Sequence, residues 1–267
     1  MTNPNLTRRA ALAGAALAAA TSVARPARAQ VAPKTFVLVP GAAGGGWQWR
    51  RVADRLEKRG CKVFALTLTG LGERSHLLTK DVGLDTHIAD VVNVVRWEGL
   101  EGVCLVAHSY AGWPCGAALD RVGDKVASVV WLDAFKPENG RALVDVVAAS
   151  ARQAYDDMAA HGELGMPLPP RLTTASVNPR DEPIVRTRLT PQPIATYMQT
   201  LRYGGGLEGI AKKTYVRLPD FPNPSFDLAY AACRGDKSWS TVELAECGHY
   251  AMFDAPERLA TLLLRAA

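Results

Sequence analysis

Several features that would point to a particular class of protein are scarce in this sequence. The apolar run at 10–20 is well short of the ~20 residues needed to cross a bilayer, so no stable membrane anchor is expected. The cysteines show neither a CxxC pair nor the Cys/His spacing of a zinc site, so no metal centre is expected either. We expect most of the five to be small core residues: Cys61, Cys104, Cys115, Cys233 and Cys247.

Excess charge is also nearly absent once the N-terminal segment is set aside. The chain has 31 Lys and Arg against 26 Asp and Glu, but Arg8, Arg9, Arg25 and Arg28 fall in the first 29 residues, which contain no acidic residue. The rest of the chain therefore has 27 basic and 26 acidic residues. Such a balance does not favour nucleic acid or an anionic membrane as a partner.

The N-terminal segment itself has the pattern of an export signal. The stretch TRRAALAGAALAAATSVARPARA contains the pair Arg8-Arg9, a short run rich in Ala and Leu, and an ARA ending that is similar to a signal-peptidase site. It predicts a Tat-type signal peptide over residues 1–29 and cleavage after Ala29. The mature protein would then be periplasmic or secreted.

Short apolar runs alternate with longer amphipathic ones from residue 34 onward. Their order is KTFVLVPG, WQWRRVADRLEKRG, CKVFALTLTG, THIADVVNVVRWEG and GVCLVAHS, which predicts strand, helix, strand, helix and strand. The strand runs are apolar almost throughout, as in parallel strands that helices cover on both faces. The sequence therefore predicts one doubly wound α/β domain over residues 30–267, with a mostly parallel sheet.

An irregular insertion interrupts this alternation over about 136–208, where prolines are frequent. The alternation resumes with KTYVRLPD, SFDLAYAACRG, WSTVELAEC and APERLATLLLRAA. An insertion between two strands of such a sheet is expected to form a lid over their carboxyl ends, where ligands of α/β proteins bind. Its apolar and aromatic side chains would suit a small hydrophobic or aromatic ligand: Met158, Met166, Leu168, Tyr197 and Met198.

The stretch LVAHSYAGWP places Ser109 where a strand ends and a helix must begin. A nucleophilic serine occupies such a turn, usually within G-x-S-x-G, because small neighbours allow its strained backbone. Here both glycines are alanines, Ala107 and Ala111, and Gly112 comes one position late. Since successive residues leaving a strand point in opposite directions, His108 is expected to pack beneath the serine.

A nucleophilic serine needs a base and an acid, which follow it in the order Ser, acid, His in this kind of fold. The segment AECGHYAMFDAPERLA supplies His249 after the last predicted strand and before the final helix. Of the five histidines, His249 alone has this position, so we interpret it as the base.

These segments together resemble the α/β-hydrolase superfamily over essentially all of residues 34–267. The resemblance lies in FVLVPGAAGGGWQWRRVADRL, LTLTGLGERS, VAHSYAG and GHYAMFDAPERLA, and it is greatest to the branch of esterases and hydroxynitrile lyases that includes plant salicylate methyl esterases. It implies an oxyanion hole made by the backbone N–H groups of Ala42 and Tyr110. The His-Gly of that branch is Pro40-Gly41 here, which leaves the backbone donors in place.

The acid has two candidate positions, because the superfamily places it after either of two strands. In the methyl-esterase relatives it follows the later strand, and an ungapped alignment puts Phe221 there with Asp220 one residue early. The earlier position holds Asp133, at the end of the strand VVWLDAF and 24 residues after Ser109. We favour Asp133 and keep Asp220 as the alternative.

The resemblance implies hydrolysis of a small, hydrophobic or aromatic carboxylic ester through an acyl-enzyme, with Ser109, Asp133 and His249 as the triad and no metal or organic cofactor. One alternative is the cyanohydrin lyase reaction, whose relatives have a threonine and a lysine where this chain has Gly41 and Tyr250. Cofactor-free dioxygenation and noncatalytic binding on the same scaffold are further alternatives. Anaerobic turnover of an ester separates hydrolysis from dioxygenation.

Overall fold

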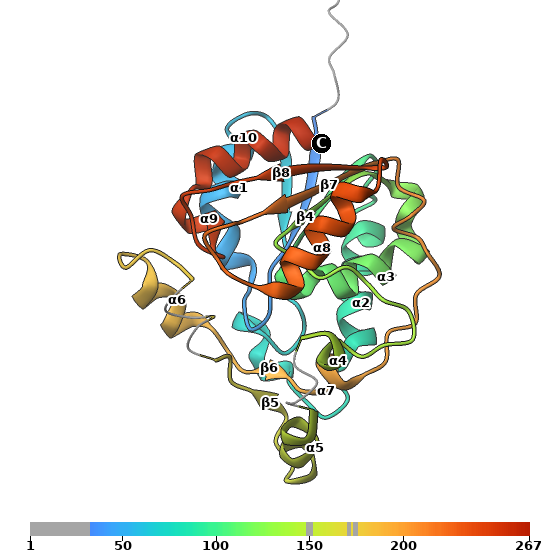
Figure 1. Ribbon diagram of the computed structural model, residues 1–267, viewed down its shortest axis with the longest axis vertical. Helices are drawn as coiled ribbons and strands as arrows, with labels where there is room; N and C mark the ends of the chain where they lie inside the picture. The colour runs from blue at the N-terminus through green and yellow to red at the C-terminus, as the bar shows by residue number, and fades with distance from the viewer. Residues whose placement is uncertain (1–32, 148–151, 170–171, 173–175) are drawn as a thin grey trace, which may run out of the picture. The chain divides into compact units, whose positions relative to one another are not determined.

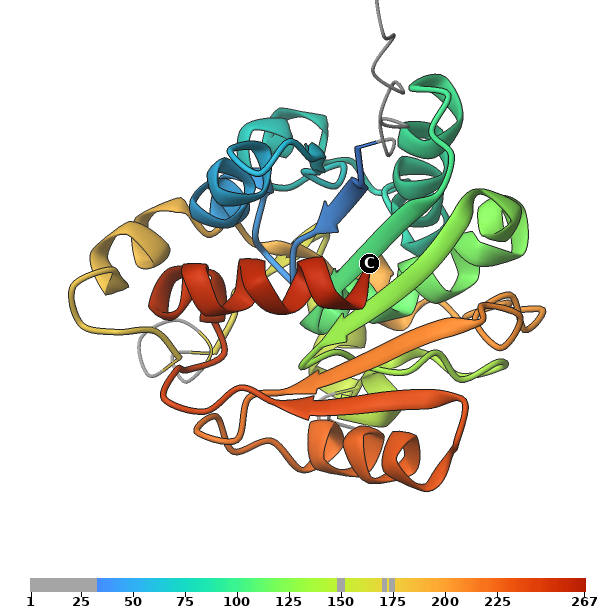
Figure 2. The same cartoon turned by 90° about the horizontal axis from the view of Figure 1, so that it is seen from above.

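The computed structural model describes residues 33–147, 152–169, 172 and 176–267. The predicted signal peptide, 1–29, lies outside these residues. The described chain is built on a six-stranded sheet whose neighbouring strands are all parallel, in the order β2-β1-β3-β4-β7-β8 (Figures 1 and 2). The strands are β1 (Thr35–Val39), β2 (Lys62–Ala65), β3 (Val103–His108), β4 (Val126–Leu132), β7 (Lys212–Arg217) and β8 (Trp239–Glu243).

Helices cover both faces of this sheet (Figure 2). One face packs against α1 (Arg50–Glu57), α9 (Ala251–Asp254) and α10 (Pro256–Ala266). The other packs against α2 (Leu84–Trp97), α3 (Gly112–Val122) and α8 (Pro224–Gly235). Short 3-10 turns precede or follow these elements at Gly46–Trp49, Gly72–Leu77, Ser109–Ala111 and Gly123–Lys125.

Alternation along the strand explains why the central strands β1 and β3 are apolar almost throughout. In β1, Phe36 and Leu38 join the core beneath α1 and α10, whereas Val37 and Val39 join the core beneath α2 and α3. Because successive side chains point to opposite faces, a strand buried on both faces needs an apolar residue at every position. The doubly wound parallel α/β class predicted from the sequence is thereby confirmed.

The segment between β4 and β7 consists of short elements at one end of the sheet (Figure 1). They are α4 (Leu143–Val147), α5 (Arg152–Ala160), β5 (Gly165–Met166), α6 (Glu182–Arg188), β6 (Gln192–Pro193) and α7 (Ala195–Met198), with β5 and β6 paired antiparallel. We refer to this segment as the lid. In the part of the chain that the structure describes, no helix combines the length and apolar character of a membrane span.

At Gly112 the helix after β3 comes very close to the backbone that follows β4. A Cβ on this residue would overlap the carbonyl oxygen of Phe135 and lie 2.8 Å from Trp131 Nε1. Neither atom can easily yield, because Trp131 Nε1 donates a hydrogen bond of 3.1 Å to that same carbonyl. The glycine one position late in the serine motif therefore serves the packing of α3 against the start of the lid.

We expect Gly112→Ala to lower the free energy of unfolding by roughly 1–3 kcal/mol, because a methyl group would be forced into a filled space. Gly235→Ala is the matched control, since a Cβ at the last residue of α8 meets nothing within 4 Å. Urea unfolding of the two variants and the parent measures both. Equal stability of the two variants would contradict this account of Gly112.

Candidate active site

Ser109 occupies a strained turn between β3 and α3. Its φ is 55°, in the left-handed region that a residue with a side chain rarely adopts, and its carbonyl accepts a hydrogen bond of 3.1 Å from Phe135 N. The chain after β1 crosses close by, because a Cβ on Gly41 would lie 3.0 Å from Ser109 Cβ and 2.9 Å from His108 Nδ1. The turn therefore requires glycine at position 41.

Asp133 and His249 meet beside this turn. Asp133 is fully buried directly after β4, and its Oδ2 lies 3.2 Å from His249 Nδ1. The backbone of Asp133 is held by its N–H, which donates to Val216 O at 2.8 Å, and has a φ of 42°. The strained backbone turns the carboxylate out of the sheet and toward the histidine.

Two further donors hold the other oxygen of this carboxylate. Arg217 Nη1 donates to Asp133 Oδ1 at 2.8 Å, and the N–H of Leu218 donates to the same atom at 2.9 Å. Burial lowers the pKa of Arg217, but the charges of Asp133 and Asp227 outweigh this effect, and the pKa lies above its ordinary value. The buried carboxylate thus has a permanent cation beside it, which offsets the cost of its burial.

The loop that carries His249 is fixed on both sides of the residue. His108 Nε2 donates to His249 O at 2.9 Å, Gly248 N donates to Asp254 Oδ2 at 2.8 Å, and Tyr250 N donates to Ser176 O at 3.0 Å. These contacts come from β3, α9 and the lid. His108, expected to pack beneath the serine, therefore orients the backbone of the histidine loop.

Aromatic rings fix the imidazole itself. The rings of Phe221 and Phe226 stack against the His249 ring, with centroids 4.5 Å and 5.3 Å away. The ungapped alignment with the methyl-esterase relatives places their acid at Phe221, and here that position carries a ring that packs on the histidine. Asp220 is exposed and accepts a hydrogen bond of 2.6 Å from Glu246 N. The structure brings Asp133 to His249 and leaves Asp220 elsewhere.

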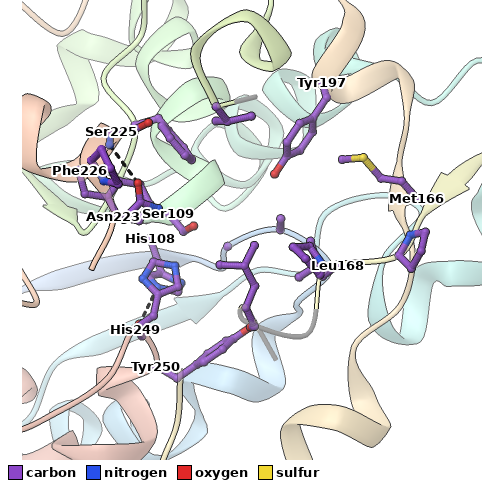
Figure 3. Close-up of a pocket in the computed structure, with 18 of the residues that line it drawn as sticks. His108, Ser109, Met166, Leu168, Tyr197, Asn223, Ser225, Phe226, His249 and Tyr250 are labelled. Atoms are coloured by element: carbon purple, nitrogen blue, oxygen red, sulfur yellow. Dashed lines mark hydrogen bonds between the residues drawn. The ribbon is translucent and has the colours of Figure 1, made fainter. Parts of the chain in front are cut away.

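Ser109 and His249 line the same cavity, of about 350 Å³ (Figure 3). No described residue hydrogen-bonds to the Ser109 hydroxyl or to His249 Nε2, so both polar atoms remain available within the part of the chain that the structure covers. Across the cavity lie Met166, Leu168 and Tyr197 of the lid. Met158 and Met198, which were expected to line a ligand site, are not among the described residues that line this cavity.

The wall of the cavity is largely apolar. Its hydrophobic members include Phe135, Val147, Met166, Leu168, Leu172 and Phe226. No Lys, Arg, Asp or Glu is among the described residues that line it, and no group of His, Cys, Asp or Glu in the described chain could hold a metal ion. The cavity suits a small, uncharged, apolar or aromatic ligand.

The loop after β1 places the backbone of Ala42 at the cavity. Among the described residues nothing accepts a hydrogen bond from the Ala42 N–H, and Ala42 lines the cavity together with Gly41. The other expected donor, the N–H of Tyr110, follows Ser109 directly at the start of the helical turn. The two N–H groups therefore come from the two chain segments that Gly41 and Ser109 bring together.

Two hydrogen bonds from the lid hold Ala43, the residue that follows Ala42. Ala43 has a φ of 60°, its N–H donates to Gln192 Oε1 at 2.7 Å, and its carbonyl accepts from Thr190 N at 3.1 Å. Gln192 is fully buried and is oriented by Nε2, which donates to Thr196 Oγ1 at 2.8 Å. The strained backbone at Ala43 is thus held by lid residues rather than by the sheet.

Comparison with known proteins shows to which family this fold belongs. Residues 36–262 match the model of the alpha/beta hydrolase family. The chain belongs to the alpha/beta hydrolase family. The resemblance inferred from the sequence is therefore confirmed.

Individual relatives of this alpha/beta hydrolase are esterases by name. It is 36% identical over 238 residues to the carbendazim hydrolyzing esterase of Nocardioides sp., which covers 85% of this chain and 97% of that protein. It is 27% identical over 254 residues to putative methylesterase 19 of Arabidopsis thaliana, covering 88% and 97%. A solved extracellular alpha/beta-hydrolase from a Paenibacillus species shares the fold, with a TM-score of 0.77, 21% identity and coverage of 88% and 99%.

Arg217, Gln192 and Asp254 are polar residues of this site that the sequence did not reveal as such. Arg217 is signalled only by a charged residue within the apolar strand run KTYVRLPD. Gln192 is signalled only by a polar residue between two prolines, Pro191 and Pro193. Neither pattern indicates the partner, because the partners are distant in sequence. Asp133 lies 84 residues from Arg217, and Ala43 lies 149 residues from Gln192.

A buried histidine lies beneath Tyr110. His87 Nε2 lies 2.8 Å from Thr69 O, an acceptor, so this nitrogen carries the proton and Nδ1 accepts from the Tyr110 hydroxyl at 2.8 Å. Burial lowers the pKa of His87 from 6.5 to about 4, although the hydrogen bond to Thr69 opposes this shift.

This pKa predicts a pH dependence of stability. Below pH 6.5 the unfolded chain protonates His87 while the folded protein does not until about pH 4, so the free energy of unfolding falls as the pH falls through this window. The slope of this decline is up to about 1.4 kcal/mol per pH unit. Above pH 6.5 His87 is neutral in both states and adds no pH dependence. Urea unfolding at several pH values should give a shallower decline for His87→Gln than for the parent. Parallel curves would contradict it.

Proposed function

We propose that this protein is a serine hydrolase that cleaves small, apolar or aromatic carboxylic esters, methyl esters in particular. The observation that carries the proposal is the buried contact of Asp133 Oδ2 with His249 Nδ1 beside Ser109, in a cavity also lined by Ala42. The esterase and methylesterase names of the relatives support the same reaction. The apolar wall and the absence of charged lining residues in the described chain support the substrate class.

The first half of the reaction forms an acyl-enzyme. Ser109 Oγ attacks the ester carbonyl carbon while His249 Nε2 takes the hydroxyl proton. The carbonyl oxygen becomes an oxyanion and accepts hydrogen bonds from the N–H groups of Ala42 and Tyr110. The bond to the alcohol oxygen then breaks, and His249 returns the proton to that oxygen, so that the alcohol leaves neutral.

The second half repeats these steps with water. His249 takes a proton from the water as its oxygen attacks the acyl carbon, and the same N–H groups hold the second oxyanion. Release of Ser109 Oγ, which regains a proton from His249, yields the carboxylic acid. Asp133 stabilises the imidazolium in both halves, and its bonds to Arg217 and Leu218 keep Oδ2 directed at Nδ1.

The lyase alternative is disfavoured by the shape of the site. The side chain that lyase relatives carry at position 41 has no room here, because a Cβ would already lie 2.9 Å from His108 Nδ1. Tyr250, at the position of their lysine, uses its hydroxyl to donate a hydrogen bond of 3.0 Å to Leu172 O. Neither position offers the group that would act on a cyanohydrin.

The triad is tested by a pair of carboxylate substitutions. We expect Asp133→Asn to lower kcat for an aryl methyl ester severely, up to ~10⁴-fold, because an amide neither stabilises the imidazolium nor holds its tautomer. Asp220→Asn is the matched control and should change kcat little, since the one hydrogen bond of Asp220 within the described residues is with Glu246 N, away from His249. Ser109→Ala should abolish acyl-enzyme turnover with the fold intact. A large loss of kcat in Asp220→Asn, together with a kcat close to that of the parent in Asp133→Asn, would assign the acid to the later strand.

A substitution in the lid tests whether Gln192 positions the loop after β1 that carries Ala42. We expect Gln192→Met to lower kcat about 10-fold or more with a smaller change in KM, because Ala43 loses its acceptor and the neighbouring Ala42 N–H loses its fixed direction. The control is Gln199→Met, which removes a similar contact between the lid and the body, from Leu84 N at 2.7 Å, away from the cavity. Steady-state kinetics and thermal unfolding of both variants are compared. Equal kcat values in the two variants, at equal stability, would exclude a positioning role for Gln192.

A further inference from the structure

Tyr197 differs from the other buried tyrosines in what its hydroxyl contacts. The hydroxyl of Tyr215 donates to Ala134 O at 2.9 Å, that of Tyr250 donates to Leu172 O, and that of Tyr110 is bonded to His87. Tyr197 is only 7% exposed, and no described residue hydrogen-bonds to its hydroxyl. The hydroxyl is not among the fully buried polar atoms that lack a partner, so it is accessible from the cavity that Tyr197 lines.

The hydroxyl cannot simply turn away to solvent, because the ring is held on two sides. The Tyr197 ring stacks on Tyr110 with centroids 5.6 Å apart and planes 5° apart. The ring of Tyr155 meets it edge-on at 6.4 Å and 89°. In this fixed orientation the hydroxyl is directed into the cavity, across from Ser109 and His249 (Figure 3).

The surroundings define the group that this hydroxyl would bind. Burial raises the pKa of Tyr197, so the hydroxyl keeps its proton at neutral pH and acts as a donor. Its neighbours on the cavity wall include Met166 and Leu168, and no charged side chain lines the cavity in the described part of the chain. An anionic acceptor would enter this cavity without a counter-ion, which is unfavourable. A neutral acceptor carried on an apolar or aromatic group fits.

We propose that the Tyr197 hydroxyl binds the acyl group of the ester, and that this acyl group is aromatic and carries a neutral hydrogen-bond acceptor, such as a ring nitrogen. The inference rests on the proposed function, with methanol as the small leaving group and the cavity filled by the acyl part. Tyr197 then selects among aromatic esters by one hydrogen bond, while the triad and the oxyanion donors act on all of them.

The test compares four methyl esters of nearly equal shape: methyl benzoate and the three methyl pyridinecarboxylates. For each ester, kcat/KM of the parent is divided by kcat/KM of Tyr197→Phe, which cancels the intrinsic reactivity of the ester. We expect the quotient to be about 3 to 10 for at least one pyridine isomer and close to 1 for methyl benzoate, since one neutral hydrogen bond is lost. Tyr203→Phe removes a hydroxyl outside the cavity and should give quotients near 1 for all four.

Equal quotients for all four esters in Tyr197→Phe would overturn the inference. Equilibrium binding of the same esters to Ser109→Ala, with and without Tyr197→Phe, gives a second readout that does not need turnover. Isomer-selective binding that is lost in Tyr197→Phe supports the role of Tyr197 even if the parent hydrolyses none of the esters, in which case the proposed function fails and not this inference. Binding that is indifferent to both the ring nitrogen and the Tyr197 hydroxyl overturns the inference alone.

Discussion

The site depends on one buried carboxylate. Asp133 has no solvent exposure, and its two oxygens are divided between the Arg217 guanidinium with Leu218 N and the imidazole of His249. A carboxylate in such a place is stable only if its partners stay, because removing one leaves a buried charge unpaired. Arg217 at the end of β7 and His249 in the loop after β8 must therefore both stay in contact with Asp133 at the end of β4. The geometry follows from the parallel order β4-β7-β8, which puts the carboxyl ends of these strands side by side.

The lid contributes to this arrangement as well as covering it. Ser176 O holds the histidine loop at Tyr250 N, and Gln192 holds the loop after β1 at Ala43. Both contacts pin backbone groups next to a residue proposed to act on substrate, and both come from outside the sheet. Preorganised donors are effective because they need no rearrangement as charge develops. A displaced lid would change the direction of the donors as well as the access to the cavity.

The sequence predicted the parallel sheet and the serine turn because these depend on local patterns, namely apolar runs and a strand followed by small residues. It also ranked Asp133 above Asp220 from the end of an apolar strand. It could not predict Arg217, Gln192 or the stacking of Phe221 on His249, because each depends on which residues meet across the fold. The lid shows the same limit: of its five expected lining residues, Met158 and Met198 are not among the described residues that line the cavity, because the sequence does not fix which face of a short lid helix meets the site.

The central claim is that Ser109, His249 and Asp133 act together with the backbone donors of Ala42 and Tyr110. A crystal structure of the protein after reaction with an aryl phosphonate tests it most directly, because the bound phosphonyl group is tetrahedral and carries the oxygen that stands for the oxyanion. The account predicts phosphorus on Ser109 Oγ, that oxygen about 3 Å from both N–H groups, and Asp133 still on His249 Nδ1. Phosphorus on another residue, or His249 turned to Asp220, would contradict it.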